Sequence, residues 1–293
     1  VPTPGPHDLR VRVQAVSVNP VDTKLRRHAA PPPGQPRILG YDVAGVVDAV
    51  GPAATLFRPG DRVWYAGDRN RPGGNAEFQL VDERLAGRMP ATLGFADAAA
   101  LPLTTITAWE ALFDRLQLPQ RGDGADGAEA DAPGAGAVLV TAGAGGVGSI
   151  AIQLARALTD AQVLATASRP ESRAQALALG AHLVLDHAQP LAPQLAAAGL
   201  RWVERIFSIT HTDQHFADLA KCIAPFGRLC AIDECGPIDV RLLKPRSASL
   251  HWEGMFTRSG FGLADMAEQG RLLNTVAALV DAVQKAKPTG ARG

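Results

Sequence analysis

The chain has 293 residues, and its 29 Lys and Arg side chains balance 29 Asp and Glu side chains, so its formal net charge is zero. This balance argues against a protein built mainly to bind nucleic acid or an acidic membrane surface, since both select for basic proteins. Three cysteines (Cys222, Cys230, Cys235) are too few for a disulfide framework and indicate a reducing compartment, which we take to be the cytoplasm. No apolar run is long enough to span a bilayer. The length predicts two domains.

The first hundred residues predict a β-rich domain. Leu9–Val18 alternates apolar and polar side chains, as a half-buried strand does. Further strands are expected at Tyr41–Val50, after the turn at Pro59–Asp61, and at Ala76–Val81. Short strands separated by Pro and Gly are typical of a small barrel or an irregular sheet.

Two segments separate this region from the rest of the chain. Thr104–Leu116 has the apolar spacing of an amphipathic helix. Residues 119–136 are rich in Gly, Ala and Asp and contain no aromatic side chain. Such a composition does not bury enough apolar surface to order the chain, so we expect a flexible linker, with an acidic recognition segment as the alternative.

Beyond the linker, strands alternate with helices. This alternation predicts βαβ units and a parallel sheet. Strands are expected at Ala137–Thr141, Gln162–Ala167, Leu183–Leu185, Arg205–Ile209, Arg228–Ile232 and Ser249–Met255, and helices at Val147–Leu158, Glu171–Leu179, Gln214–Ile223 and Ala264–Val283.

A glycine-rich turn lies between the first of these strands and the first helix. Gly143, Gly145 and Gly148 form the spacing G-x-G-x-x-G, and the turn is completed by Ala142, Gly146 and Val147. One glycine allows the tight turn, one lets backbone N–H groups approach a pyrophosphate, and one lets helix and strand pack closely. The turn therefore predicts a dinucleotide site. The alternative is a glycine-rich loop that binds nothing.

The end of the next strand predicts which dinucleotide. NAD-binding folds place a carboxylate about 20 residues after the glycines, where it holds the ribose 2′-hydroxyl. This chain has Ser168 there, followed by Arg169 and Arg173. Guanidinium groups match phosphate geometry, so we expect a 2′-phosphate, and hence NADPH. The alternative is that both arginines are surface charges that pair with Glu171.

Several motifs resemble those of one family. Gly60–Val63 (GDRV) and Ala142–Gly148 (AGAGGVG) resemble the medium-chain dehydrogenase/reductase superfamily. Five other stretches are most similar to its zinc-type alcohol dehydrogenase-like and quinone oxidoreductase group: Ser17–Asp22, Tyr65–Asp82, Asp186–Gln194, Thr210–Phe216 and Ser249–Ser259.

The resemblance implies an α/β protein with two domains. Residues 1–103 would form a GroES-like catalytic domain that lacks its first strand, residues 104–283 a Rossmann NADPH-binding domain with a doubly wound parallel sheet, and residues 284–293 a tail. It also implies hydride transfer from NADPH to a small-molecule quinone or α,β-unsaturated carbonyl. The expected assembly is a homodimer joined through the Rossmann sheet.

The same resemblance implies three catalytic residues. Thr107 would pack beside the nicotinamide, and Asn19 and Tyr41 would face the substrate. Both of the latter side chains can donate hydrogen bonds to an oxygen that develops negative charge.

The chain departs from the zinc-dependent members of the family. They have a Cys ligand where this chain has Asn19, and Gly-His-Glu where it has Gly40-Tyr41-Asp42. Their third ligand, a Cys, falls near Leu101 and Pro102. Residues 61–80 contain no Cys, so the structural zinc lobe has no counterpart either. Because Zn²⁺ requires converging Cys, His or carboxylate groups, we expect no metal.

Other patterns carry weaker hypotheses. His211 and His215 have a spacing that could share a metal, but no third ligand is evident, and a helix cap is the simpler interpretation. The cysteines are expected in the core. Two alternative functions remain open: a zinc-dependent alcohol dehydrogenase, and a non-catalytic NADPH-binding protein with a redox-sensing or structural role.

Overall fold

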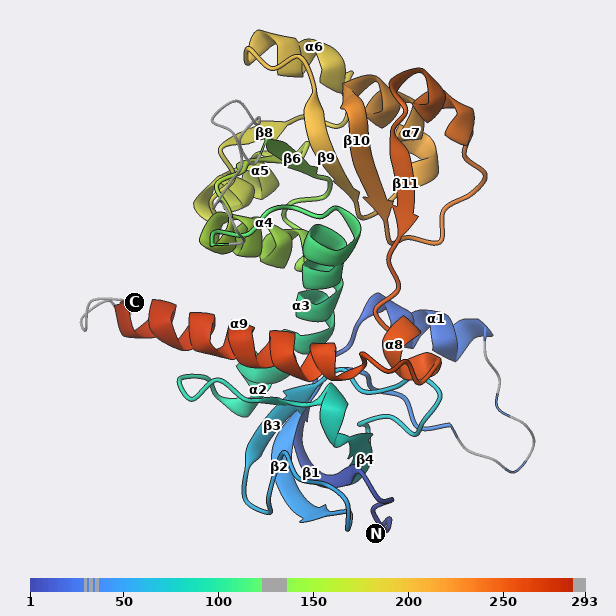
Figure 1. Cartoon of the computed structure of the whole chain (residues 1–293), viewed down its shortest axis with the longest axis vertical. Coiled ribbons are helices and arrows are strands. Elements are labelled where there is room, and N and C mark those ends of the chain that lie inside the picture. Colours follow the sequence, from blue (N-terminus) through green and yellow to red (C-terminus); the bar gives the residue numbers. More distant parts are fainter. Residues whose placement is uncertain (29–30, 32–33, 35–36, 123–135, 287–293) are drawn as a thin grey trace. The chain divides into compact units, whose positions relative to one another are not determined.

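A computed structural model describes residues 1–28, 31, 34, 37–122 and 136–286. The predicted linker lies mostly outside the described residues, as does most of the predicted tail. The chain forms two compact units, one of Val1–Ile106 with Met255–Gly293 and one of Thr107–Gly254. One unit contains an antiparallel sheet and the other a parallel sheet, so the predicted α/β class is confirmed (Figure 1).

The sheet of the first unit has five strands in the order β4-β1-β2-β3-β5. The β-rich prediction for this region is confirmed, and all pairings of the sheet are antiparallel. Its core consists of side chains that alternate along β1 and its neighbours, including Leu9, Val11, Val43 and Val63. The strands are β1 (Asp8–Val16), β2 (Val43–Val50), β3 (Arg62–Tyr65), β4 (Phe78–Asp82) and β5 (Gly87–Arg88).

Short helices connect these strands. The sequence did not predict α1 (Pro20–His28), which carries five charged or imidazole side chains in nine residues and buries only Asp22. Its helical start is favoured by Pro20, because the fixed backbone angle of proline suits the first helical position. The other helical elements of this unit are η1 (Glu83–Leu85), α2 (Phe95–Ala99), α8 (Thr257–Gly260) and α9 (Ala267–Ala286).

Helix α9 packs on the first unit. Its Leu273 lies so close to Gly87 of β5 that a Cβ on that glycine would be 2.6 Å from the Leu273 Cβ. The side chain of Asn274 accepts a hydrogen bond from the Arg88 N–H at 2.7 Å, and Asp281 accepts one from the Thr92 hydroxyl. This differs from the expectation that the Rossmann domain runs to residue 283. The periodicity of a helix shows that one face is buried, but not which domain buries it.

The sheet of the second unit has six parallel strands in the order β11-β10-β9-β6-β7-β8. Read from β8, this is the doubly wound order in which the chain reverses direction beside its first strand, β6. Ligands of such sheets bind outside the carboxyl ends of the strands at that reversal. The strands are β6 (Ala137–Val140), β7 (Gln162–Thr166), β8 (Leu183–Leu185), β9 (Val203–Ser208), β10 (Ile223–Ala231) and β11 (Ser249–Trp252).

Helices accompany this sheet, and the apolar core of the unit includes Leu139, Leu164 and Ile206. They are α4 (Gly146–Leu158), α5 (Pro170–Ala178), α6 (Leu191–Ala197), α7 (Thr212–Cys222) and the 3₁₀ segment η3 (Val240–Arg246). No helix in the described ranges is long and apolar enough to cross a bilayer.

The predicted helix Thr104–Leu116 is two elements. Helix α3 (Pro102–Trp109) continues as the π-helical segment η2 (Glu110–Arg115). Glu110 is buried, and Glu253 is buried beside it with an ion pair to Arg115 at 2.7 Å. Burial and the neighbouring Glu110 raise the pKa of Glu253, while Arg115 acts against this. Such a buried acidic pair is a tertiary feature that helical periodicity does not reveal.

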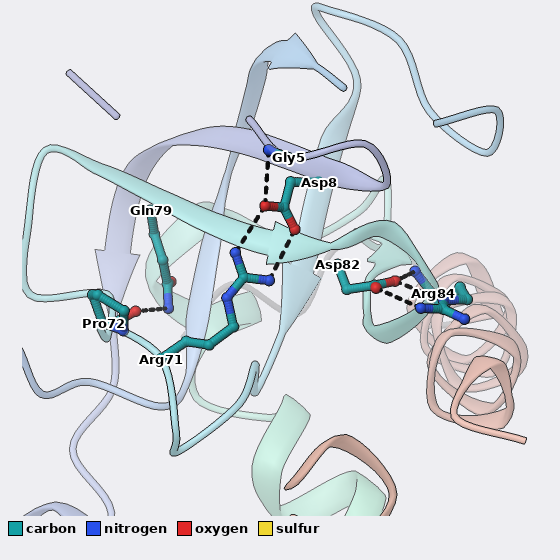
Figure 2. Close-up of polar contacts among 7 residues, drawn as sticks. All are labelled: Gly5, Asp8, Arg71, Pro72, Gln79, Asp82 and Arg84. Atoms are coloured by element: carbon teal, nitrogen blue, oxygen red, sulfur yellow. Dashed lines mark hydrogen bonds and ion pairs between the residues drawn. The ribbon is translucent and has the colours of Figure 1, made fainter. Parts of the chain in front are cut away.

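An ion pair attaches the segment between β3 and β4 to the start of β1 (Figure 2). Two guanidinium nitrogens of Arg71 donate to the two carboxylate oxygens of Asp8 at 2.8 and 2.9 Å. Asp8 also accepts a hydrogen bond from the Gly5 N–H, and Gln79 donates to the Pro72 carbonyl at 3.0 Å. Burial acts to raise the pKa of Asp8, but the hydrogen bonds and charge of Arg71 outweigh it, so the pKa is lowered.

Replacing Asp8 by Asn is therefore expected to lower the free energy of unfolding by about 1 kcal/mol at pH 7, because one carboxylate loses a bidentate, partly buried partner. Since the pKa of Asp8 is lowered in the folded state, this stabilisation is present above the ordinary value of 3.8 and is lost as the pH falls below it. Chemical denaturation of both proteins at pH 7 and pH 3 measures the difference.

Asp239 provides the matched control, because it has the same two-pronged contact with Arg241 on an exposed surface. Asp239→Asn should leave stability unchanged at both pH values. A difference for Asp8→Asn that persists at pH 3 would contradict the role assigned to the ion pair.

Candidate functional site

The glycine-rich turn between β6 and α4 leaves no room for side chains at two of its glycines. A Cβ on Gly143 would lie 2.7 Å from the Ala165 Cβ, and one on Gly148 would lie 2.4 Å from the Ala142 carbonyl oxygen. Ala142 itself has a left-handed backbone with φ of 49°. The predicted reason for these glycines, close packing of a helix against a strand and a tight turn, agrees with this geometry.

The start of α4 has the features of an anion site. Gly145 is the residue that caps the helix, and it has no side chain with which to satisfy the first N–H groups. The N–H groups of Gly146, Val147 and Gly148 are in the first turn, where they have no acceptor within the helix. They therefore point out of the helix start, where a phosphate is stabilised by both the N–H groups and the helix dipole.

A cavity of about 360 Å³ opens beside this turn. Ser168 and Arg169, which follow β7, contribute to its wall, together with His187, which follows β8. The other lining residues are Ala142, Ala144, Gly145, Thr166, Ala167, Ser172 and Gln175. No Asp or Glu belongs to this lining in the part of the chain that the structure describes. The charged side chain on this lining is therefore the Arg169 guanidinium, which favours an anionic ligand.

Arg173 has a different place from the one that the sequence suggested. Its guanidinium donates to the carbonyls of Ala167 at 3.2 Å and Val184 at 2.9 Å, and it does not belong to the cavity lining. It ties the end of β7 to β8. Of the two arginines predicted to bind the cofactor, only Arg169 lines the cavity.

A second polar cluster lies in the first unit, around Asp42. Its two carboxylate oxygens accept hydrogen bonds from the Asn19 side-chain amide at 2.8 Å and from the Leu103 N–H at 2.9 Å. Asp22 accepts hydrogen bonds from the N–H groups of Asn19 at 2.8 Å and Gly40 at 3.0 Å. The cluster thus joins the start of α1, the segment before β2 and the start of α3.

The charge state of Asp42 is set by its surroundings. Burial raises its pKa to about 8, the negative charge of Asp22 adds to this, and the hydrogen bonds from Asn19 and Leu103 oppose it. At neutral pH the carboxyl group is therefore largely protonated.

Tyr41 is fully buried, and its hydroxyl has no hydrogen-bond partner among the described residues. Its ring packs edge-on against Phe256 at 5.6 Å. Gly40 precedes it with φ of +106°, and Gly74 and Asn75 donate backbone hydrogen bonds to Gly40 and Leu39. A buried hydroxyl without a partner is costly, so its persistence marks a donor that a ligand can use.

The predicted catalytic residues thus differ in their surroundings. Asn19 is 8% exposed and its amide is already bonded to Asp42, whereas the Tyr41 hydroxyl is uncommitted. Thr107 is 6% exposed on α3 and belongs to the second unit, while Asn19 and Tyr41 belong to the first. Sequence reasoning missed Asp42 and Asp22. A carboxylate directly after Tyr41 was the available signal.

The residues at the expected zinc positions do not fit a zinc ion. Within the described ranges, no group of three or more His, Cys, Asp and Glu side chains could hold a metal. Asn19 donates its amide to Asp42, and burial keeps the pKa of that carboxyl at about 8, so neither presents the anionic or imidazole donors that zinc prefers.

The remaining candidates from the sequence have clear places. His215 packs edge-on against His187 at 5.8 Å, and His211 is the residue before α7. Cys222 and Cys230 are buried, and burial raises the pKa of each thiol to about 12. These two cysteines are core residues with protonated thiols, which do not act as nucleophiles.

Two family descriptions match the chain: "Alcohol dehydrogenase GroES-like domain" over residues 5–106 and "Zinc-binding dehydrogenase" over residues 146–247. This chain is a medium-chain dehydrogenase/reductase. The predicted family is thereby confirmed, and members of this superfamily are oxidoreductases that use a nicotinamide nucleotide.

Individual relatives of this medium-chain dehydrogenase/reductase have different names. A zinc-type alcohol dehydrogenase-like protein of Staphylococcus aureus is 38% identical over 94% of this chain and 79% of its own length. A quinone oxidoreductase of Rattus norvegicus is 33% identical over 82% of this chain and 68% of its own. The crystal structure of a putative zinc-dependent alcohol dehydrogenase from Rhizobium etli is 55% identical, with a TM-score of 0.89 over 97% of this chain and 80% of that one.

The buried Asp42 predicts a pH-dependent stability. Because its pKa is raised to about 8 when folded and is 3.8 ordinarily, the folded state binds one more proton between these values, so stability falls as the pH rises from 4 to 8. Relative to Asp42→Asn, which does not titrate, the wild-type free energy of unfolding should fall by about 1 kcal/mol or more between pH 5 and pH 8. Chemical denaturation at each pH measures it. A difference that is constant, or that grows with pH, would show that Asp42 is ionised in the folded protein.

Proposed function

We propose that this chain is a zinc-independent, NADPH-dependent oxidoreductase that transfers hydride to a quinone or an α,β-unsaturated carbonyl. The observation that carries the proposal is the cavity at the glycine-rich turn, whose wall has Ser168 and Arg169 but no carboxylate. NAD-specific sites need that carboxylate for the ribose hydroxyl, and a guanidinium is suited to a phosphate in its place. The quinone oxidoreductases among the relatives support the substrate class.

The nucleotide would be held by backbone and side chain together. The N–H groups of Gly146, Val147 and Gly148 would bind the pyrophosphate at the start of α4, where Gly145 lines the cavity. Arg169 and Ser168 would bind the 2′-phosphate, and Thr107 would pack beside the nicotinamide. When bound, the nicotinamide ring supplies the hydride.

The protein must also stabilise the negative charge that hydride addition leaves on the substrate oxygen. The Tyr41 hydroxyl is the donor that we assign to this role, because it is buried, has no partner among the described residues, and follows Gly40 beside the Asn19–Asp42 hydrogen bond. A preorganised donor of this kind contributes about 3–4 kcal/mol to the transition state. Asn19 would support the site by holding Asp42, and through it the start of α3 at Leu103.

Assembly and location form part of the proposal. Strand β11 is at the edge of the parallel sheet, and its Trp252 is 53% exposed. Exposed edge strands pair readily with another chain, which supports a homodimer joined through this sheet. The three cysteines are unpaired, which agrees with the reducing, cytoplasmic location that we propose.

The names of the relatives favour a zinc-dependent alcohol dehydrogenase as the second candidate. That function would need metal ligands which the Asn19 and Asp42 pair does not offer. A non-catalytic NADPH-binding protein is the third candidate, and turnover with quinones and enones separates it from the first.

Arg169→Ala tests the cofactor assignment. The variant should bind NADPH roughly tenfold to a hundredfold more weakly, because a charge-assisted contact with the 2′-phosphate is lost, while NADH binding should not change. Titration calorimetry with both nucleotides measures this. Arg241→Ala serves as a control, since this arginine is exposed on η3 and pairs with Asp239. Equal affinity of the wild-type protein for the two nucleotides would overturn the assignment.

Tyr41→Phe tests the oxyanion donor. It keeps the buried ring and its contact with Phe256, and it removes only the hydroxyl. We expect kcat with enones to fall about tenfold or more while the Kd for NADPH stays constant, and quinones to be affected less because their reduced form is a more stable anion. The control is the only other tyrosine, Tyr65, whose hydroxyl already donates to Gln79 at 3.0 Å. Tyr65→Phe should not change the enone-to-quinone ratio. An unchanged ratio in Tyr41→Phe would place the donor elsewhere.

A further inference from the structure

One ionisable side chain on the wall of the nucleotide cavity has no part in the function proposed so far. His187 is half-buried at the end of β8, and it lines both the 360 Å³ cavity and an adjacent cavity of about 40 Å³. Within the described part of the chain, its ring forms no hydrogen bond, and its one ring contact is with His215. Its two nitrogens are therefore available to a ligand in the cavity that Arg169 also lines.

The second histidine, His215 on α7, sets where a proton can go. Burial lowers the pKa of His215, and the charges of His187 and His211 lower it further, against weaker effects of Asp218 and Asp213. Asp218 is also engaged by the Leu191 N–H at 2.7 Å. His215 is thus neutral near pH 7, and its ring lies against His187 at 69°. His215 is therefore an unfavourable site for a proton.

The charges around His187 determine when that happens. Before a nucleotide binds, the guanidinium of Arg169 disfavours a second positive charge on this wall, and no carboxylate of the described residues belongs to the lining. Asp186, which precedes His187, accepts a hydrogen bond from the Ala188 N–H and is not part of that lining. A 2′-phosphate carries nearly two negative charges above pH 7 and reverses this balance. A nucleotide without that phosphate does not, because the ribose hydroxyl is uncharged.

We propose that His187 is a proton-coupled specificity residue of the 2′-phosphate subsite: it takes up a proton when a 2′-phosphorylated nucleotide binds, so that the preference for NADPH over NADH increases as the pH falls. This inference rests on the proposed NADPH site. A metal-binding role for the histidines is the competing explanation, but no third ligand lies near them in the described ranges.

The consequence is a measurable linkage between pH and nucleotide preference. Each proton taken up on binding changes the affinity tenfold per pH unit. The phosphate is already a dianion above pH 7, and Arg169 keeps its charge, so neither changes between pH 7 and pH 9. A pH-dependent preference in this range therefore reports on the histidines.

The test is titration calorimetry with NADPH and with NADH at pH 7, 8 and 9, each in two buffers of different ionisation enthalpy. For the wild-type protein, NADPH should bind with uptake of part of a proton at pH 7, and NADH with none. The ratio of the two affinities should fall about tenfold between pH 7 and pH 9. His187→Gln, which offers an uncharged amide, should show a ratio that does not change with pH and no proton uptake.

Two further variants assign the effect. His211→Gln removes the exposed histidine that lines only the smaller cavity, and it should retain the wild-type dependence on pH. His28→Gln on α1 of the first unit should retain it as well. Circular dichroism and thermal denaturation of every variant show whether each is folded.

The two levels of the proposal fail differently. The role of His187 is wrong, and the NADPH site stands, in either of two cases. In the first, the wild-type protein binds NADPH well but the ratio of its NADPH and NADH affinities is constant from pH 7 to pH 9. In the second, His187→Gln keeps the pH dependence of that ratio seen in the wild-type protein. If NADPH does not bind, or binds no better than NADH at pH 7, the proposed function itself is wrong.

Discussion

A buried carboxyl group, Asp42, organises the first unit. Its oxygens are bonded to Asn19 from the start of α1 and to the Leu103 N–H at the start of α3, and it directly follows Tyr41. A charge in such a place is costly, and here the cost is avoided because burial raises the pKa to about 8 and keeps the group largely protonated at pH 7. Hydrogen bonds hold together the segments at which zinc-dependent relatives are expected to place metal ligands.

This arrangement changes what the site can do. In the proposed metal-free mechanism, hydrogen-bond donors that are fixed in place beforehand stabilise the developing negative charge. Asn19 donates its amide to Asp42, so in this proposal it is a supporting residue. Tyr41 keeps a buried, unpartnered hydroxyl among the described residues, and its backbone is held by the contacts of Gly40 and Leu39 with Gly74 and Asn75. In the proposal, Asn19 supports the site and Tyr41 donates the hydrogen bond, because of these two only the Tyr41 side chain has no hydrogen-bond partner among the described residues.

The second unit follows a different constraint, the close approach of α4 to the end of β6. The Cβ positions at Gly143 and Gly148 are occupied by neighbouring atoms, so glycine is required by packing before any nucleotide is considered. The same turn exposes N–H groups beside a cavity with one guanidinium, which makes the fold requirement and the anion site inseparable. If the proposed nucleotide site is right, stability and binding depend on the same residues at this turn.

Much of this could be predicted from the sequence, because strand and helix periods, turn residues and the glycine spacing are local signals. The parallel strands of the second unit and the β-rich character of the first were predicted in this way, with β8 placed at Leu183–Leu185, whereas the antiparallel pairing of the first unit was not. Contacts between segments that are distant in the sequence could not be predicted, because no local pattern of residues indicates them. Periodicity did not assign α9 to the first unit, and charge alone did not separate Arg169 in the cavity from Arg173, which binds the carbonyls of Ala167 and Val184. The bond from Asn19 to Asp42 joins residues 23 positions apart, and Asp42 was missed for that reason.

The central claim, that this oxidoreductase works with NADPH and without zinc, is tested most directly by turnover of metal-depleted protein. The purified chain would be treated with a chelator and its zinc content measured, and NADPH oxidation would then be followed with a quinone and an enone as acceptors. The account predicts that turnover is retained with far less than one zinc per chain, and that added zinc does not increase it. One tightly held zinc per chain, lost together with activity and restored with it, would contradict the account.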